Sequence, residues 1–274
     1  MITGTYASVF AGALGAALGS FFNVLIYRLP REESVISPGS HCPECGHAIG
    51  PLENIPLVSY GVLRGKCRWC KAPISLIYPA VELLTVCAAL LLWIAYVAPR
   101  LSDAQPWQIP VILFQALTLL LLIPISCIDA RHYIIPDILT VPGIVVSAAL
   151  SFLPGGLTPL QSGLGIAVGA GSLWLMGIIG SWALKKKDSM GGGDVRLMAL
   201  IGGLWGWQIA FGAIFAASLM GTVVGLVLIA EKKLGQDHKL PFGPFLALGT
   251  WAAVLAMQLV SAGYLRWLDR MITG

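Results

Sequence analysis

Two aspartates stand where apolar segments of this chain end or begin, and they are the first candidates for chemistry. Asp129 follows the apolar run 109–128, and Asp194 follows the three glycines 191–193 and opens the run 195–206. An ionisable group at the edge of a membrane span is costly, so it is a functional hypothesis by default. When two carboxylates lie close together, one holds a proton, so one can activate a water while the other protonates a scissile amide. Taken alone, Asp194 can equally be a helix N-cap after a flexible loop.

Other acids near the apolar runs have simpler interpretations. Asp137 follows Pro136 at the start of a run, which predicts a helix N-cap. Glu82 lies one turn inside its run, and we expect it to form a buried ion pair with a basic neighbour such as Arg28. The four histidines lie in loops without a matching nucleophile motif, and the metalloprotease pattern His-Glu-x-x-His is absent from the sequence. An aspartate pair is therefore the hydrolytic site that the sequence favours.

Four cysteines form the second chemical constellation. Cys42 and Cys45 make one Cys-x-x-Cys pair, Cys67 and Cys70 make another, and 21 residues separate the pairs. Each pair can place two thiolates on one tetrahedral ion, and four sulfurs leave no open position for water, so we predict a structural zinc site. The polar loop that holds them is too small for a hydrophobic core, and a metal would supply folding energy. Redox chemistry or incidental thiols are the alternatives, and His41 is a possible substitute ligand.

The elements that must position these groups are membrane segments. The chain has 274 residues, 57% of them hydrophobic and 11% charged, with a mean hydropathy of +0.83, whereas a soluble domain carries about 25% charged residues. We therefore predict an all-α polytopic membrane protein with about eight hydrophobic segments and a small zinc-ribbon-like domain. The apolar runs are 6–27, 76–98, 109–128, 138–153, 164–184, 195–206, 208–230 and 242–265. The run 195–206 is too short to cross a bilayer of about 30 Å at roughly 1.5 Å per residue, so it is short, re-entrant or tilted within protein.

The distribution of Lys and Arg predicts the topology. If the eight segments alternate, every Lys and Arg except Arg100, Arg266 and Arg270 falls on one side of the membrane. The positive-inside rule makes that side cytoplasmic and puts both termini outside. The same count places Asp129 and Asp194 at the same, cytoplasmic edge. It also places the cysteines in the cytoplasm, where disulfides are disfavoured. The net charge of +4 is small and does not favour a nucleic-acid partner.

Small residues at four-residue spacing predict how the segments pack. Glycines recur in three such pairs, at 15 and 19, at 165 and 169, and at 221 and 225. This spacing is typical of close contacts between membrane helices, because small residues let two backbones approach. We give these glycines a packing role and no function.

Several motifs together resemble one known family, the bacterial type IV prepilin peptidases, which are bifunctional leader peptidases and N-methyltransferases. The resemblance runs over nearly the whole chain. Its motifs are SFFNVLIYRLP at 20–30, the two cysteine pairs enclosing ENIP at 53–56 and LRGKC at 63–67, ISLIYPAVE at 74–82, the segments 129–140 and 190–202, and PFGPF at 241–245. Arg196 is a departure, because the family often has Lys there, and the charge is kept.

The resemblance implies an aspartic endopeptidase of the GxGD type. By motif, Asp129 and Asp194 would be the catalytic pair, and Asp137 would be structural. The implied substrates are type IV prepilins and type II secretion pseudopilins, which carry a short basic leader ending in glycine. The family also methylates the new N-terminal amine with S-adenosylmethionine, an activity associated with the cysteine-bearing loop. Gly65 and Lys66 are candidates for binding that donor, and a tight turn before Cys67 is the alternative reading.

The resemblance also implies an organisation and a location. We expect a first transmembrane helix at 1–29, a cytoplasmic four-cysteine zinc-binding domain associated with methyl transfer at 30–75, and a membrane-embedded peptidase core at 76–274. The protein would lie in the lipid bilayer of a bacterial inner membrane. Glu32, Glu33, Glu53 or lipid headgroups would recognise the basic leader, and the sequence does not choose among them. A peptidase without methyltransferase activity and an ion-coupled transporter are the alternative functions, although transporter sites lie near the midplane rather than one face.

Overall fold

The computed structural model describes residues 2–184, 190–231 and 240–273, and it divides them into two compact units. The first unit is Met1–Pro99 and the second is Arg100–Gly274. Six lysines that were counted for the topology, at 185–187, 232, 233 and 239, lie outside the described residues.

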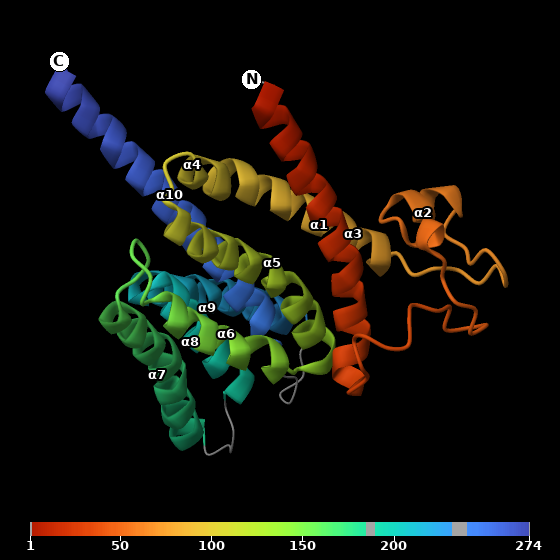
Figure 1. Cartoon of the computed structure of the whole chain (residues 1–274). Helices are drawn as coiled ribbons and strands as arrows, with labels where there is room; N and C mark the ends of the chain where they lie inside the picture. The colour runs from red at the N-terminus through yellow and green to blue at the C-terminus, as the bar shows by residue number, and fades with distance from the viewer. Residues whose placement is uncertain (1, 185–189, 232–239, 274) are drawn as a thin grey trace. The chain divides into compact units, whose positions relative to one another are not determined.

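The described residues are helical and contain no β-strand (Figure 1). In the first unit the elements are α1 (Ile2–Arg28), η1 (Leu29–Arg31), η2 (Pro51–Asn54), α2 (Val58–Val62), α3 (Ile77–Leu92), the π-helical turn η3 (Trp93–Val97) and α4 (Ala98–Leu101). In the second they are η4 (Pro106–Gln108), α5 (Ile109–His132), α6 (Asp137–Leu150), α7 (Pro159–Leu184), α8 (Gly192–Trp205), α9 (Trp207–Ala230) and α10 (Gly243–Thr273).

The predicted hydrophobic segments all appear as helices. Among the described residues, six helices are long and apolar enough to cross a membrane: Thr5–Arg31, Ile77–Leu101, Pro106–His132, Pro159–Trp182, Trp207–Ala230 and Gly243–Val260. The other two segments, α6 and α8, have 14 residues each, fewer than the roughly 20 that a span needs. The chain is therefore a multi-pass membrane protein in which two apolar helices, α6 and α8, are shorter than the other six.

In the first unit, α1 and α3 pack against each other through the first glycine pair. A Cβ atom added to Gly15 would lie 2.7 Å from the Cβ of Ala89, and one added to Gly19 would lie 2.8 Å from the Cα of Glu82. Only glycine permits backbones this close. The expected packing role is confirmed for this pair, and the contact sets the position of Glu82 on α3.

In the second unit, α8 is enclosed by other helices. Its residues 197–204 are all buried, and it contacts α6, α7, α9 and α10. A helix that is apolar on every side belongs in the interior, which confirms the prediction that this short segment lies within protein. On α7, Gly165 and Gly169 face the backbone of α8 so closely that a Cβ on either would overlap it. The third glycine pair does not pack in this way, because Gly225 has no neighbour within 4 Å of an added Cβ.

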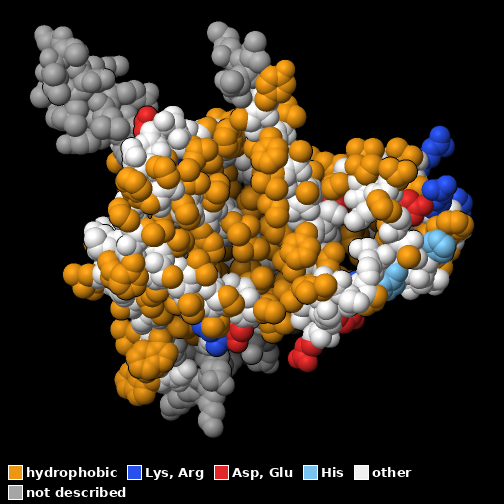
Figure 2. Space-filling model, in the orientation of Figure 1, with side chains coloured by type: hydrophobic (Ala, Val, Ile, Leu, Met, Phe, Trp, Pro, Cys, Tyr) orange, Lys and Arg blue, Asp and Glu red, His pale blue; other side chains and the backbone are white. Residues whose placement is uncertain are grey.

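The surface of the helices is apolar, as a lipid-facing surface must be. Figure 2 shows hydrophobic side chains over the helices, with most of the visible Lys, Arg and His side chains at the right edge of the view. Large apolar side chains are exposed even at the middle of spanning helices, among them Phe215 (66%) and Trp174 (62%). Exposed apolar surface on this scale is unfavourable in water, and it fits the multi-pass arrangement.

Candidate active site and metal centre

Asp129 lies in the last turn of α5 with its carboxylate against the start of α10. The side chain is buried, and its Oδ2 accepts a 2.8 Å hydrogen bond from the backbone N–H of Gly243. Gly243 is the first residue of α10, where N–H groups have no partner within their own helix. A Cβ on Gly243 would lie 2.9 Å from the Asp129 Cγ, so the close approach requires glycine. Asp129 is thus held by the N-terminus of another helix, where negative charge is favoured.

Asp194 lies in the first turn of α8 and is not its N-cap. The helix begins at Gly192, and its N-cap position is Gly191, which has no side chain to cap the helix. A Cβ on Gly193 would lie 2.8 Å from the Cβ of Ile135, which belongs to the segment that follows α5. The third glycine of the motif therefore lets the start of α8 approach the chain just beyond Asp129, and this contact brings the two aspartates together.

The electrostatics of Asp194 show that the two carboxylates interact. Its helix is not one of the spanning segments. Burial, and then the negative charge of Asp129, raise the pKa of Asp194 to about 7, while a hydrogen bond from the Gly191 N–H acts in the opposite direction. Its Oδ1 atom is buried and has no hydrogen-bond partner among the described residues. Near neutral pH the two carboxylates can therefore share one proton, and burial together with the neighbouring charge favours the protonated form of Asp194.

Asp137 is not the N-cap that the sequence predicted. It is the first residue of α6, Pro136 holds the N-cap position, and no side-chain cap forms. Instead, Asp137 Oδ1 lies 2.7 Å from Nη2 of Arg196, two residues beyond Asp194 in α8. A charged partner outweighs a cap because the guanidinium can reach the carboxylate across the two helix starts. This ion pair ties α6 to the first turns of α8. Local sequence carried no sign of it, because the two residues are far apart in the chain.

The four cysteines form one cluster. The Sγ atoms of Cys42, Cys45, Cys67 and Cys70 all lie within 4.8 Å of one another, and those of Cys42 and Cys70 are 3.8 Å apart. Tetrahedral coordination at about 2.3 Å would separate the sulfurs by roughly this distance. His41 does not belong to the cluster. The predicted ligands are therefore brought together in a donor set that can hold a metal ion.

The two Cys-x-x-Cys segments fold into the same turn. In the first, the N–H of Gly46 donates to the Cys42 carbonyl at 2.9 Å, and in the second the N–H of Lys71 donates to the Cys67 carbonyl at 3.1 Å. Gly46 and Lys71 both have positive φ, 69° and 61°. That conformation is easy for glycine and uncommon for lysine. The repeat of the turn directs both cysteine pairs toward one point.

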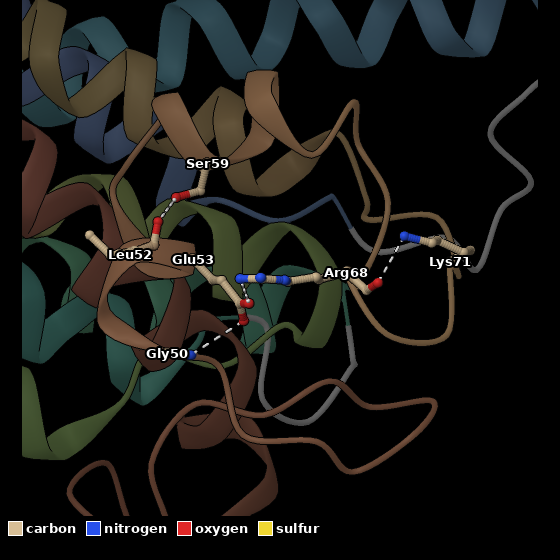
Figure 3. A network of polar contacts seen from close by, with 6 residues as sticks. All are labelled: Gly50, Leu52, Glu53, Ser59, Arg68 and Lys71. Carbon is tan, nitrogen blue, oxygen red and sulfur yellow. Dashed lines mark hydrogen bonds and ion pairs between the residues drawn. The ribbon is translucent and has the colours of Figure 1, made fainter.

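An ion pair joins the second of these turns to η2 (Figure 3). Arg68 Nη1 is 3.1 Å from Glu53 Oε1, and the other carboxylate oxygen of Glu53 accepts a 3.4 Å hydrogen bond from the Gly50 N–H. Glu53 is therefore engaged inside the loop. Of the three acids considered for leader recognition, only Glu32 and Glu33 remain exposed.

The expected ion pair between Glu82 and Arg28 does not form. Arg28 is buried and donates to three backbone carbonyls, those of Ser34 (2.9 Å), Pro38 (2.6 Å) and Gly39 (3.2 Å). Glu82 Oε2 instead accepts a 2.7 Å hydrogen bond from the Leu57 N–H. The correction has a physical reason: the planar guanidinium offers several donors in a fixed fork, and the chain leaving α1 folds back around it.

Gly65 and Lys66 lie in a tight turn. Gly65 has a φ of 68°, and its N–H donates to the carbonyl of Tyr60 at 2.9 Å. Lys66 pairs with Pro73 in an isolated antiparallel bridge. The turn that was the alternative reading is therefore present.

The fold and this site define a class: a multi-pass helical membrane protein with a four-cysteine loop and with a buried aspartate, Asp129, whose charge acts on the partly buried Asp194. Comparison with known proteins agrees. Residues 13–96 match the bacterial Peptidase A24 N-terminal domain, and residues 116–226 match the type IV leader peptidase family. The chain belongs to this leader peptidase family, whose matched region contains both Asp129 and Asp194.

Three relatives illustrate the similarity, and each is a prepilin leader peptidase/N-methyltransferase. The one from Myxococcus xanthus is 37% identical over 89% of this chain and 71% of its own length. The one from Pseudomonas aeruginosa is 34% identical over 93% of this chain and 92% of its own. The one from Neisseria gonorrhoeae is 32% identical over 97% and 96%. No solved structure matches the chain significantly.

Proposed function

We propose that this protein removes the leader from type IV prepilins and type II secretion pseudopilins and then methylates the new N-terminal amine. The names of its relatives support both activities. The observation that supports the peptidase is the pair formed by the buried Asp129 and the partly buried Asp194, in which burial, and then the charge of Asp129, raise the pKa of Asp194 to about 7. A proton held on one of two close carboxylates is what general acid–base hydrolysis of an amide requires.

The two aspartates take different roles in this proposal. Asp129, ionised and held at Oδ2 by Gly243, accepts a proton from the water that attacks the scissile carbonyl carbon. Asp194 donates its proton to the leaving amide nitrogen as the C–N bond breaks. The pair ends the step with the proton on Asp129, and exchange with solvent restores the starting state. Because the carboxylates titrate as a unit, the assignment describes the dominant state of the pair.

The four-cysteine loop has a separate role. We propose that its metal is zinc and structural, because four thiolates close the coordination sphere. We assign 30–75 as the loop associated with methyl transfer and 76–274 as the peptidase core. S-adenosylmethionine supplies the methyl group when bound. The positive-inside rule supports a cytoplasmic active site and four-cysteine loop and periplasmic termini, in a bacterial inner membrane.

The decisive experiment is cleavage of a detergent-solubilised prepilin. Asp129→Asn and Asp194→Asn should each abolish cleavage while the variants still fold and insert. Asp103→Asn is the matched control, because Asp103 is an exposed aspartate of the same unit, and it should cleave normally. Substantial cleavage by either of the first two variants would refute the pair.

A second assay separates the two activities. Labelled methyl from S-adenosylmethionine should appear on the cleaved pilin, and not on the uncleaved precursor. Cleavage without any transfer would restrict the function to a peptidase.

A further inference from the structure

The first unit contains a cavity of about 400 Å³ beside the cysteine cluster. The helices α1 and α3 line one side, with Asn23 and Tyr27 from α1 and Tyr78 and Glu82 from α3. The loop lines the other side with Tyr60, Trp69 and apolar residues such as Ile55 and Ile74. Cavities of roughly 300–1,000 Å³ with mostly apolar walls and a few polar groups are typical small-molecule sites.

Glu82 places a carboxylate in the wall of this cavity, and no Lys or Arg side chain among the described residues forms an ion pair with it. The side chain is half-buried, and its one hydrogen bond among the described residues comes from the Leu57 N–H. Two arginines also line the cavity, but Arg28 is engaged with three carbonyls and Arg68 with Glu53. A half-buried carboxylate with no positive partner favours a cationic ligand.

The backbone is arranged to meet this carboxylate. Leu57 adopts a φ of 63° and a ψ of −46°, outside the regions that a leucine ordinarily occupies. That conformation points its N–H at Glu82 Oε2. Strained residues of this kind cluster at ligand sites, where the surrounding structure holds them. The loop therefore orients Glu82 toward a fixed position at the cavity wall.

Aromatic rings form much of the remaining wall. Tyr27, Tyr60, Tyr78, Trp69 and His47 all line the cavity, and the rings of His47 and Trp69 lie 4.1 Å apart. Aromatic rings bind both nucleobases, by stacking, and organic cations, by their negative faces. A ligand that carries a purine and a positive charge on one small molecule matches this combination.

Gly65 leaves room for the ring of Tyr60, which lines the cavity. Neither Gly65 nor Lys66 lines the cavity. A Cβ on Gly65 would, however, lie 2.8 Å from the Tyr60 hydroxyl oxygen and 3.0 Å from its Cζ. With its φ of 68°, this position tolerates only glycine without strain. Gly65 thus acts through Tyr60 as a positioning residue.

We propose that this cavity is the site of S-adenosylmethionine and that Glu82 recognises its cationic sulfonium. The proposal rests on the methyltransferase half of the proposed function. The donor has the required chemistry, a purine and a sulfonium cation. Its product, S-adenosylhomocysteine, is the same size but carries a neutral thioether in place of the sulfonium. The two ligands therefore differ in the positive charge at sulfur, which is the group that Glu82 would bind.

The test is direct binding of both ligands to the metal-loaded, detergent-solubilised full chain, by equilibrium dialysis with labelled ligand. Glu82→Gln keeps an oxygen for the Leu57 N–H and removes the charge. It should weaken binding of the donor by roughly two- to fivefold, the range of a partly exposed charge pair, and leave binding of the thioether product nearly unchanged. Equal weakening of both ligands, or of neither, would overturn the role of Glu82.

A second pair of variants tests the cavity itself. Gly65→Ala should displace the Tyr60 ring and weaken donor and product alike. Gly61→Ala is the matched control in the same loop, since no atom lies within 4 Å of an added Cβ there, and it should bind both ligands as the wild type does. Metal content measured for each variant reports whether the loop is folded.

The outcomes also separate this proposal from the proposed function. If the wild type transfers methyl to cleaved pilin while Glu82→Gln and Gly65→Ala bind both ligands normally, the donor binds elsewhere and the function stands. If the wild type neither binds the donor nor transfers methyl, the methyltransferase function falls, and the cavity assignment falls with it.

Discussion

The backbone N–H of Gly243 donates a 2.8 Å hydrogen bond to Oδ2 of Asp129, across 114 positions of the chain. The contact joins the end of α5 to the start of α10. It fixes one oxygen of the carboxylate and leaves the other for chemistry. The donor is a main-chain N–H group at a helix start, so the bond depends on the position of the backbone at Gly243 as well as on the Asp129 side chain.

Gly243→Ala tests this contact. The added Cβ would lie 2.7 Å from Asp129 Oδ2, so the carboxylate or the start of α10 must move. We expect cleavage to fall by roughly 100-fold, the size of effect that a displacement of about 1 Å produces. Gly225→Ala is the control, since an added Cβ there has no neighbour within 4 Å. Equal cleavage rates for the two variants would show that the contact is dispensable.

The pH dependence of cleavage should reflect the proton on Asp194. That carboxyl must be protonated to act as an acid, and its pKa is raised to about 7. Activity should therefore fall as the pH rises through about 7, because Asp194 loses its proton, and it should be retained just below that pH. The profile of kcat/KM reports the free enzyme. A rate that stays constant well into the alkaline range would contradict the assignment.

The ion pair between Asp137 and Arg196 should couple α6 to α8. Both side chains are about half exposed, so we expect a coupling energy of about 0.2–1 kcal/mol in a double-mutant cycle of unfolding. Arg196→Ala should lower the cleavage rate several-fold by loosening the turn that holds Asp194, while Arg196→Lys should retain most of it. Reversing both charges, with Asp137→Arg and Arg196→Asp together, should recover more activity than either change alone. If the effects of the two single substitutions on the free energy of unfolding simply add, the ion pair does not couple α6 to α8.

Loss of metal should affect the four-cysteine loop and spare the aspartate pair. Cys42→Ser removes one of four clustered sulfurs, so bound zinc should drop and amide exchange in the loop should rise. Cys87→Ser is the control, because Cys87 belongs to the same unit but not to the cluster. Mass spectrometry measures the bound zinc, and a prepilin cleavage assay measures whether the aspartate pair is still active. Full zinc content in Cys42→Ser would rule out the four-sulfur site.

Arg28 should stabilise the exit from α1 through its three carbonyl contacts. Arg28→Lys keeps the charge but loses the fork of donors, and we expect the first unit to lose about 2 kcal/mol of stability. Arg31→Lys, at an exposed arginine of the following turn, should change little. Thermal unfolding followed by loss of metal measures the difference. Similar midpoints for the two variants would show that the carbonyl contacts contribute little.

The helices and the cysteine cluster were predictable from sequence because local patterns determine them. A helix that crosses a bilayer needs a long run of apolar residues, so the spanning helices could be located from the apolar runs in the sequence. The run after Asp194 was too short to span, and its enclosure by other helices followed. The spacing of Cys42, Cys45, Cys67 and Cys70 likewise carried the geometry of tetrahedral coordination.

The contacts that orient the charged groups were not predictable in the same way. Asp137 looked like a helix cap and is an ion-pair partner of Arg196. Glu82 was expected to pair with Arg28, yet each found a backbone group instead. A charged side chain chooses among all donors and acceptors that the tertiary fold brings near, and local sequence holds only a few of them. For the same reason nothing near Asp129 in the sequence pointed to Gly243.

The packing of α7 against α8 has a consequence for how this protein can change. Gly165 and Gly202 face each other so closely that a methyl group on either would overlap the backbone of the other. Neither position can therefore accept a side chain alone, and any shift of α8 along this seam moves Asp194 at its far end. The position of Asp194 is therefore constrained by two buried glycines, Gly165 on α7 and Gly202 near the other end of α8.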